Sequence, residues 1–422
     1  MAKIWIESYG CSASFADSEI ISGIISKEGH KLVNNIEDSD LNIIVTCSVK
    51  DATVGKMINR INKLKNKPLV IAGCLPKTER KIIEKISPDA SLLGPNSLIN
   101  TNQVIRSTLA GRKKVELLDM DKTKSYLPKI RLNKVVGIIE IGKGCINKCT
   151  FCQTKISKGE LYSYRIGDII RQIKNEINGD CKEIWLTSTD NGCYGFDIDC
   201  NLPKLINEIT KIKNSFMVRI GMMNPMHLPK ICSELVDSYA NKKVFKFIHV
   251  PVQSGNDEVL RHMRRGHTSK VFTDIVKKFR SSFKKCTIST DIIVGFPTES
   301  DEQFFETIKL LKETNPDIVN LSKYSRRPGT ESFKLEQLSS HEIKRRSKIA
   351  SELVNKISFE NNKKWIGWKG EILIDEKNEN GVKGRNFAYK PVFINNHYIK
   401  LGKILNVKIT NCTNHCLIGS IN

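Results

Sequence analysis

The sequence lacks any apolar run that approaches the roughly 18 residues of a membrane-spanning helix. It also lacks the apolar stretch of a secretory signal, because charged and polar residues interrupt the start MAKIWIESYG at once. No segment is of low complexity. We therefore expect a cytoplasmic protein without a membrane partner. Its 422 residues, of which 40% are hydrophobic, are enough for two or three packed domains.

Acidic residues are few relative to basic ones: 45 Asp and Glu stand against 68 Lys and Arg, and the formal net charge is +23. The many Lys, Asn and Ile residues are typical of an AT-biased genome, which explains the charge without any function. An excess of Lys and Arg is equally typical of proteins that bind a polyanion such as a nucleic acid. Only the position of the basic residues along the chain can separate these two explanations.

A disulfide framework is not expected, because clustered cysteines in a reducing compartment more often bind metal or carry out chemistry. Three of the 13 cysteines end apolar runs near the N-terminus: KIWIESYGC ends at Cys11, LNIIVTC at Cys47 and PLVIAGC at Cys74. A helical pattern follows each run, and strands alternating with helices predict a doubly wound parallel sheet. Since ligands bind beyond the carboxyl ends of such strands, we expect the three cysteines to meet at one sheet edge.

The polar stretch 119–134 is predicted to be a linker, after which the alternation of strands and helices resumes. Six strands are expected, at residues 135–141, 183–188, 216–221, 244–250, 287–296 and 317–322. Six strands are too few for a complete eight-stranded barrel, so we predict an open, partial (β/α)6 barrel. In barrels of this kind the active site lies at the carboxyl ends of the strands.

The C-terminal part of the sequence has a different character. A long basic helix is expected near residues 340–362, with Ser339 or Ser340 at its start. Short alternating strands are then expected, at 371–376, 392–394, 398–402 and 404–410, and they predict a small β-barrel. The chain as a whole is therefore expected to be of the α/β class, with three domains. Their predicted bounds are 1–120, 121–360 and 361–422.

Three further cysteines crowd into the stretch GCINKCTFC, directly after the first strand of the predicted partial barrel: Cys145, Cys149 and Cys152. A structural zinc site needs four ligands, and the nearest later cysteine and histidine, Cys181 and His227, are too distant in sequence. Three thiolates suit three irons of a 4Fe-4S cluster and leave the fourth iron open to another ligand. A trio of buried structural cysteines is the alternative.

The stretch resembles the signature of the radical S-adenosylmethionine (AdoMet) superfamily. The resemblance implies that the open iron binds AdoMet, that AdoMet is cleaved to methionine and a 5′-deoxyadenosyl radical, and that Phe151 lies near its adenine. Other polar residues at the ends of the predicted barrel strands are candidate contacts to the cofactor or substrate, or else satisfied polar groups at the barrel rim. These candidates are Ser188, Thr189, Asp190, His249, Gln253 and Asp291.

Over essentially its full length the chain resembles the methylthiotransferases of this superfamily. The resemblance implies that Cys11, Cys47 and Cys74 bind a second 4Fe-4S cluster, and that AdoMet is both methyl donor and radical source. Val45 and Ser14 stand at places near this second cluster where the family often has Asn. The remaining seven cysteines are interpreted as structural or incidental: Cys181, Cys193, Cys200, Cys232, Cys286, Cys412 and Cys416.

Several stretches resemble the archaeal and eukaryotic branch of the family, namely Thr154-Lys155 after the motif and the segments EIWLTSTDNGCYGFDI and RIGMMNPMHL. This implies transfer of a methylthio group to C2 of N6-threonylcarbamoyladenosine at tRNA position 37. The C–H bond at C2 is neither acidic nor attached to a leaving group, so acid–base catalysis cannot activate it. The alternative substrates are an N6-isopentenyladenosine tRNA and a ribosomal-protein aspartate. Outside the enzymes, the alternative is a non-catalytic iron–sulfur or zinc protein that binds RNA and senses redox state. The sequence indicates neither the sulfur donor nor the reductant of the clusters.

The region 361–422 resembles a TRAM domain, a small RNA-binding β-barrel, and holds ten basic residues against four acidic ones. Basic residues interleaved with aromatic ones suit phosphate contact and base stacking, and the expected partner is the anticodon loop of a tRNA. A solvated basic face and an aromatic barrel core are the alternative. The predicted RNA contacts are Arg326, Arg327, Lys383, Arg385, Phe387 and Lys390.

Overall fold

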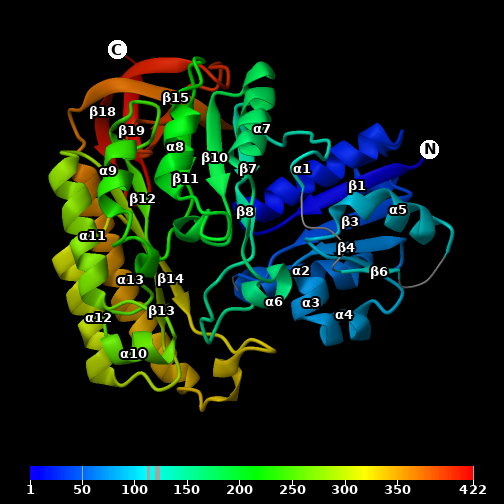
Figure 1. Cartoon of the computed structure of the whole chain (residues 1–422), viewed down its shortest axis with the longest axis horizontal. Coiled ribbons are helices and arrows are strands. Elements are labelled where there is room, and N and C mark those ends of the chain that lie inside the picture. Colours follow the sequence, from blue (N-terminus) through cyan, green and yellow to red (C-terminus); the bar gives the residue numbers. More distant parts are fainter. Residues whose placement is uncertain (50, 112–114, 119–123, 422) are drawn as a thin grey trace.

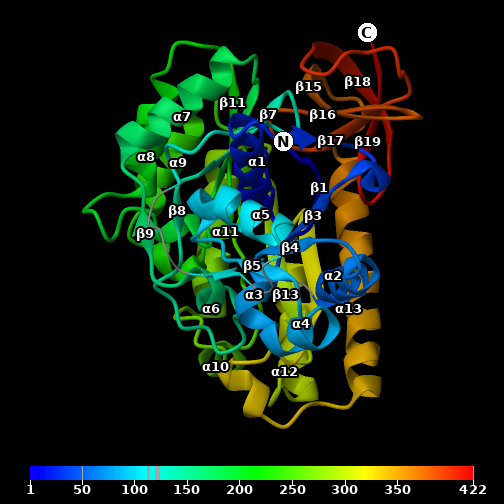
Figure 2. The ribbon, with the colours of Figure 1, turned by 90° about the vertical axis from the view of Figure 1, so that its right-hand side faces the viewer.

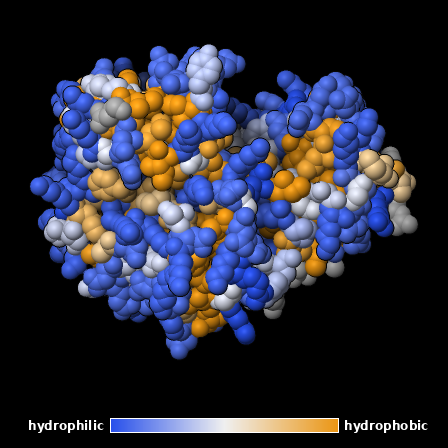
Figure 3. Space-filling view, turned by 90° about the horizontal axis from the view of Figure 1, so that it is seen from above, coloured by the Kyte–Doolittle hydropathy of each residue, from blue (hydrophilic) through white to orange (hydrophobic). Residues whose placement is uncertain are grey.

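The computed structural model describes residues 1–49, 51–111, 115–118 and 124–421. Figure 1 shows an N-terminal sheet on the right, a partial barrel with its outer helices on the left, and a small barrel at the C-terminus above it. Seen from above, hydrophilic residues cover most of the molecule, and hydrophobic residues gather in separate areas of its two lobes (Figure 3). None of the helices in the described ranges is both long and apolar enough to cross a membrane.

The N-terminal sheet is parallel throughout, with the strand order β2-β1-β3-β4-β5-β6. Its strands are β1 (Lys3–Ser8), β2 (Lys31–Leu32), β3 (Leu41–Thr46), β4 (Leu69–Gly73), β5 (Ser91–Leu93) and β6 (Glu116–Leu117). Its helices are α1 (Ser12–Lys27), α2 (Asp51–Leu64), α3 (Leu75–Thr78), α4 (Arg80–Ile86) and α5 (Thr101–Leu109). Helices cover both faces, so β3 and β4 are buried at every residue, and the predicted doubly wound sheet is confirmed.

The partial barrel holds all six predicted strands: β7 (Val136–Glu140), β10 (Glu183–Thr187), β11 (Met217–Ile220), β12 (Phe247–His249), β13 (Thr287–Val294) and β14 (Ile318–Lys323). They form two parallel three-stranded sheets, β11-β10-β7 and β12-β13-β14, joined by one bridge between Val218 and Val244. The outer helices are α7 (Ile166–Asn178), α8 (Leu202–Thr210), α9 (Cys232–Ala240), α10 (Asp257–His262), α11 (Ser269–Ser282) and α12 (Asp301–Thr314). The loop after β7 contains β8 (Gly142–Lys143), α6 (Thr154–Lys158) and β9 (Tyr162–Ser163).

A long helix, α13 (Ser340–Lys363), leads from the partial barrel to the C-terminal barrel (Figure 2). The hydroxyl of Ser339 caps it by accepting the backbone N–H of Glu342 at 3.1 Å, as the predicted helix start requires. The C-terminal strands are β15 (Lys369–Asn378), β16 (Gly381–Arg385), β17 (Pro391–Ile394), β18 (Ile404–Cys412) and β19 (Leu417–Ile421), and they close a barrel in the order β15-β16-β17-β19-β18. The predicted small barrel is confirmed.

One predicted strand of this barrel is wrong. Residues 398–402 contain no strand: Tyr398 lies in one turn, and Leu401 and Gly402 lie in another, in which Gly402 has a φ of +80°. Tyr398 is correspondingly 82% exposed. The barrel closes instead through β16 and β19, which the sequence pattern did not reveal because Gly and Lys in β16 and Gly and Ser in β19 interrupt their apolar residues.

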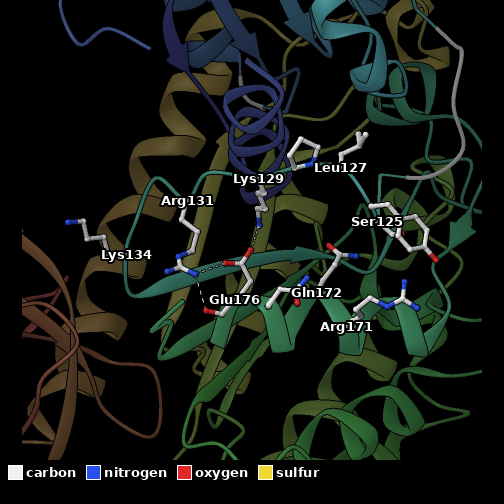
Figure 4. A pocket seen from close by; sticks show the side chains of 11 residues that line it. Ser125, Leu127, Lys129, Arg131, Lys134, Arg171, Gln172 and Glu176 are labelled. Carbon is white, nitrogen blue, oxygen red and sulfur yellow. Dashed lines mark hydrogen bonds and ion pairs between the residues drawn. The ribbon is translucent and has the colours of Figure 1, made fainter. Parts of the chain in front are cut away.

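The predicted linker is a packed connection in its described part. Residues 119–123, and with them the predicted boundary at 120, lie outside the described residues, whereas 124–134 contain neither helix nor strand. Lys129 is 2.9 Å from a carboxylate oxygen of Glu19 on α1 and 3.2 Å from one of Glu176 on α7 (Figure 4). The segment therefore joins the N-terminal sheet to the partial barrel in one fixed arrangement.

Candidate functional site

The loop that carries Cys145, Cys149 and Cys152 depends on a glycine. Gly144 has a φ of +66°, and a Cβ atom at this position would lie 1.8 Å from the carbonyl oxygen of Glu160. The antiparallel pairing of β8 with β9 closes the base of the loop. The three cysteines are thus held just beyond the carboxyl end of β7, where the sequence predicted them.

Two nitrogen donors point at the sulfurs of this triad. The backbone N–H of Asn147 donates to Sγ of Cys145, and the guanidinium of Arg265 donates to Sγ of Cys149, both at 3.4 Å. Burial raises the pKa of the Cys149 thiol, although Arg265 opposes this shift. Hydrogen bonds to sulfur and limited exposure are typical surroundings of cluster thiolates, so the three cysteines fit a 4Fe-4S cluster.

Cys193, interpreted from the sequence as incidental, lies beside this triad. It is fully buried at the end of a short 3-10 helix that follows β10, and its thiol donates to the backbone carbonyl of Asp190 at 3.3 Å. The interaction between the sulfurs of Cys145 and Cys193 lowers the pKa of Cys145 and raises that of Cys193. The sequence signal was its position shortly after a predicted strand end, at the same rim as the triad.

Asp190 is buried beside the same loop and makes four polar contacts. Its Oδ1 accepts the backbone N–H groups of Gly192 at 2.9 Å and of Asn224 at 3.0 Å. Its Oδ2 accepts Nδ2 of Asn147 at 3.0 Å and lies 3.5 Å from Nε2 of His227. With Cys193, Asp190 and His227 form a group whose possible ligand atoms lie within 4.8 Å of one another. Since the Asp190 oxygens are already satisfied, we assign this group to holding the cysteine loop rather than a metal ion.

Ser188 and Thr189 provide the strongest sign of a polar ligand at the rim. Their hydroxyl oxygens are buried and have no hydrogen-bond partner among the described residues. Buried hydroxyls without partners are costly, so such groups in a native protein usually meet a ligand or water. Both follow β10 directly, next to Asp190. Such hydroxyls suit a polar ligand, and a contact of these two residues with AdoMet stays a prediction.

His249, Gln253 and Asp291 form a second polar group inside the partial barrel. Nε2 of His249 lies 3.0 Å from Oδ1 of Asp291, which also accepts Nδ2 of Asn320 at 2.7 Å. The backbone N–H of Gln253, a residue with a φ of +75°, donates to the carbonyl of Asp291 at 2.9 Å. Sequence reasoning missed Asn320, although it lies within the predicted strand 317–322.

Phe151 is not fully exposed at the rim of the partial barrel. It is partly buried and packs against a small apolar cluster that includes Met263, Phe296 and Tyr324. Packing under the loop, the alternative role considered for this residue, is therefore real. A position beside the adenine of AdoMet remains a prediction.

The second triad lies at the carboxyl ends of three neighbouring strands, since Cys11, Cys47 and Cys74 follow β1, β3 and β4. Gly10 permits the approach: its φ is +107°, and a Cβ atom there would lie 2.0 Å from Cβ of Cys47. The interaction between the sulfurs of Cys11 and Cys47 lowers the pKa of Cys11 and raises that of Cys47. Burial raises the pKa of Cys74. The predicted convergence at one sheet edge is therefore present in the structure.

The two unusual residues near this triad differ in their position. Val45 is fully buried in the apolar core on one face of the N-terminal sheet. Ser14 lies on α1, and its Oγ is 3.6 Å from Sγ of Cys11. Only Ser14 therefore contacts a cysteine of the triad directly.

The two triads face one interface between the N-terminal sheet and the partial barrel. α6, which begins two residues after Cys152, packs against α3, which begins just after Cys74. The side chain of Gln153 donates to Oε1 of Glu79 at 3.0 Å, and the charge of Lys158 on α6 acts on Cys74. Residues next to one triad thus contact the residues that carry the other.

Buried charges complete this interface. Glu140, the last residue of β7, lies 3.3 Å from Nζ of Lys158 and 3.2 Å from Nζ of Lys124, and Lys124 lies 2.6 Å from Asp17 on α1. Burial would raise the pKa of Glu140, but the two lysines outweigh it and lower this pKa to about 2. The hydroxyl of Tyr164 also donates to Glu140, at 3.3 Å. The buried charges of the interface therefore pair with one another.

Two of the predicted RNA contacts are engaged inside the protein. Lys390 is 2% exposed, and its Nζ lies 2.9 Å from Oδ1 of Asp317. Arg385 lies 2.8 Å from Asp375, and its guanidinium covers the ring of Tyr389. Their charges are neutralised within the C-terminal part of the molecule, so the structure does not favour either residue as a phosphate contact.

The other predicted RNA contacts are more varied. Lys383 is partly exposed, with Glu376 at 3.6 Å, and Phe387 is 39% exposed beside two tryptophans of the barrel. Arg326 is exposed and lies over the ring of Phe333, at 4.5 Å from its centre. Arg327 is only 8% exposed. Lys383, Phe387 and Arg326 are accessible to a nucleic acid, and Arg327 is not.

A pocket of about 640 Å3 lies between the connecting segment and α7. Figure 4 shows Lys129 and Arg131 directed at Glu176 within it, while Arg171 and Lys134 extend at its margins. None of the predicted site residues lines this pocket. Because it contains neither a cysteine nor a rim residue of the partial barrel, we do not regard it as the reaction site.

Comparison with known proteins agrees with this geometry. Residues 139–311 match the Radical SAM superfamily, and residues 3–94 match Uncharacterized protein family UPF0004. A Pyrococcus horikoshii protein named "Probable threonylcarbamoyladenosine tRNA methylthiotransferase" is 40% identical over 100% of both chains. A Homo sapiens protein named "Threonylcarbamoyladenosine tRNA methylthiotransferase" is 33% identical over 99% of this chain and 73% of its own length. The chain belongs to the methylthiotransferase family of radical AdoMet enzymes.

Solved structures of radical AdoMet enzymes share the fold at low sequence identity. The methyltransferase TsrM from Kitasatospora setae, solved with cobalamin and a 4Fe-4S cluster, has a TM-score of 0.59 at 13% identity, over 79% of this chain and 77% of that one. The cobalamin-dependent radical enzyme OxsB has a TM-score of 0.53 at 12% identity, over 84% of this chain and 56% of that one. Family membership confirms the prediction of an enzyme and implies AdoMet and a 4Fe-4S cluster as its cofactors.

Proposed function

We propose that this methylthiotransferase acts on tRNA and installs a methylthio group on C2 of N6-threonylcarbamoyladenosine at position 37, with AdoMet and two 4Fe-4S clusters. The names of its full-length relatives support this substrate. The observation that carries the proposal is the contact between α6 and α3, which brings the surroundings of both triads to one interface. Joining sulfur to an unactivated C–H bond needs a radical source and a sulfur-holding site close together.

When bound, AdoMet and the clusters supply the radical and the methyl group, which amino-acid side chains cannot provide. The chain binds and orients them. Cys145, Cys149 and Cys152 would hold one cluster. The hydroxyls of Ser188 and Thr189, which have no partner among the described residues, would form hydrogen bonds with AdoMet.

Other residues of the rim position the cysteine loop, the cofactor or the substrate and take no part in the chemical step. Asp190 keeps the cysteine loop in place through Asn147. His249, the last residue of β12, and Asp291, within β13, are hydrogen-bonded to each other and present a polar surface for the cofactor or the target nucleoside.

The tRNA would approach from the rim with help from the C-terminal barrel. We assign domains to residues 1–120, 121–360 and 361–422, with the last as the RNA-binding domain. Arg326, Lys383 and Phe387 are the contacts whose exposure supports this role, through phosphate pairing and base stacking. A cytoplasmic location agrees with a tRNA substrate.

The substrate is tested by mass spectrometry of tRNA nucleosides from a strain that lacks the gene. The methylthio form of N6-threonylcarbamoyladenosine should disappear, and the unmodified precursor should accumulate. The gene with Cys149→Ala should fail to restore the product, because one ligand of the AdoMet-binding cluster is missing. A nucleoside pattern unchanged by the deletion would refute the assignment of substrate.

The chemistry is tested on anaerobically purified protein. Two clusters correspond to about eight irons per chain, whereas a zinc-binding or redox-sensing protein without catalysis would hold zinc or fewer irons. Cys149→Ala should abolish the formation of 5′-deoxyadenosine from AdoMet. Formation of 5′-deoxyadenosine at the parent rate by this variant would exclude the assigned role of the triad.

A further inference from the structure

Lys158 is a buried lysine for which the proposed reaction gives no role. Its side chain is 4% exposed, and it is the last residue of α6, the helix that follows Cys152. A buried ammonium group is costly unless anions surround it closely. The groups close to Lys158 therefore indicate what its positive charge interacts with.

One neighbour of Lys158 is a carboxylate that already has a partner. Glu140 lies 3.3 Å from Lys158, but it also lies 3.2 Å from Lys124, which in turn pairs with Asp17 at 2.6 Å. These two ammonium groups and two carboxylates balance one another. Two members of this group also act electrostatically on Cys74, with opposite signs: Lys158 lowers the pKa of this thiol and Asp17 raises it. Lys158 acts on Cys11 as well.

The helix that Lys158 ends, α6, packs against α3, which begins directly after Cys74 of that triad. The positive charge of Lys158 acts on both Cys11 and Cys74. The preceding residue, Ser157, is fully buried, and its hydroxyl donates to the carbonyl of Thr154 at 3.1 Å. The end of α6 therefore places a buried ammonium group on the side of the N-terminal sheet that carries the cysteines. Because the side chains of Ser157 and Lys158 are both buried, this arrangement is fixed rather than one of many surface conformations.

We propose that Lys158 is a positioning residue whose fixed positive charge raises the reduction potential of a cluster held by Cys11, Cys47 and Cys74. The inference rests on the proposed function, because it requires a cluster at this triad. A cluster that accepts an electron gains one negative charge. A cation close to it in a poorly solvated environment stabilises the reduced form more than the oxidised form.

The experiment isolates the N-terminal cluster. The full chain with Cys145, Cys149 and Cys152 all replaced by alanine is reconstituted anaerobically and should hold about four irons. Its midpoint potential is measured by a dye-mediated redox titration, with the reduced cluster followed by electron paramagnetic resonance. This readout does not depend on catalysis, which the variant cannot perform.

Three substitutions are then compared in this background. Lys158→Met removes the charge at similar volume and should lower the midpoint potential, while Lys158→Arg keeps the charge and should leave the potential near that of the parent. Lys174→Met is the matched control, because Lys174 is an exposed lysine on α7 and its loss changes the net charge equally. It should leave the potential unchanged.

Each outcome bears on the inference. Absence of iron from the three-alanine parent would contradict the second cluster, and with it both the proposed function and the inference. With iron present, equal potentials for the parent and Lys158→Met would overturn the inference alone. If Lys158→Met lost its iron, retention by Lys158→Arg would support a need for the charge. Loss of iron by both would instead show that packing of the side chain matters, against the inference.

Discussion

Replacing Lys390 by methionine separates a structural role of this residue from RNA binding. Nζ of Lys390 lies 2.9 Å from both Asp317 and Asn362, at 2% exposure. Removing one partner of a buried ion pair costs about 3–5 kcal/mol, because the other charge stays buried. Asp317 keeps two neighbours, the backbone N–H of Ile288 at 3.0 Å and Arg280 at 4.0 Å. We therefore expect the lower end of the range, about 3 kcal/mol.

The assay is urea unfolding followed by tryptophan fluorescence. Trp365 lies in the core of the C-terminal barrel and Trp368 packs against it, so their emission reports on the region that Lys390 supports. With a urea dependence of about 2 kcal/mol per M, the loss corresponds to a midpoint lower by about 1.5 M. Binding of a tRNA anticodon stem-loop, measured at a urea-free condition where the variant is folded, should be little changed.

Two further variants make the result specific. Lys383→Met is the control, since its exposed contact with Glu376 at 3.6 Å contributes less than about 1 kcal/mol. Combining Lys390→Met with Asp317→Asn should recover much of the stability, because no unpaired charge is then buried. An unchanged unfolding midpoint for Lys390→Met, together with weaker RNA binding, would refute the structural role and restore the residue as an RNA contact.

The remaining predictions concern protonation and the cysteine loops. Burial raises the pKa of Glu183 to about 7, so the folded protein keeps a proton that the unfolded chain loses near pH 4.5. Stability should therefore fall as the pH rises from about 4.5 to about 7, and Glu183→Gln should abolish this slope in thermal unfolding. Gly10→Ala and Gly144→Ala should each lose about four irons by chemical analysis, because the added Cβ atoms collide with the chain beside one triad. Cys193→Ala should keep the parent iron content, and loss of iron would make this residue a ligand.

The two triads could be predicted from the sequence because each follows an apolar run. In a parallel sheet the carboxyl ends of neighbouring strands share an edge, so Cys11, Cys47 and Cys74 had to come together once their strands were recognised. The residues that the sequence did not reveal lie outside this pattern. Cys193 reaches the first triad through a short 3-10 helix, and Lys158 reaches the second through contacts between two domains.

The predicted RNA contacts failed in part for a related reason. Composition counts the basic residues of the C-terminal barrel, but it does not show which of them already have partners. Lys390 pairs with Asp317 of the partial barrel, a residue far away in the sequence. The same ion pair shows that the C-terminal barrel is docked through buried charge, so part of its basic composition serves this contact instead of a nucleic acid.

The contact between α3 and α6 explains why the segment that joins the N-terminal sheet to the partial barrel is so highly charged. Lys124 and Lys129, both from the connecting segment, pair with Asp17 and Glu19 on α1 and also with carboxylates of the partial barrel. α1 begins directly after Cys11, so each pair fixes the distance between the N-terminal triad and the loop that follows β7. An apolar interface of the same size would allow the two sheets to slide, because hydrophobic contact has no direction. Paired charges resist such movement, since a shifted pair leaves a buried charge without its partner.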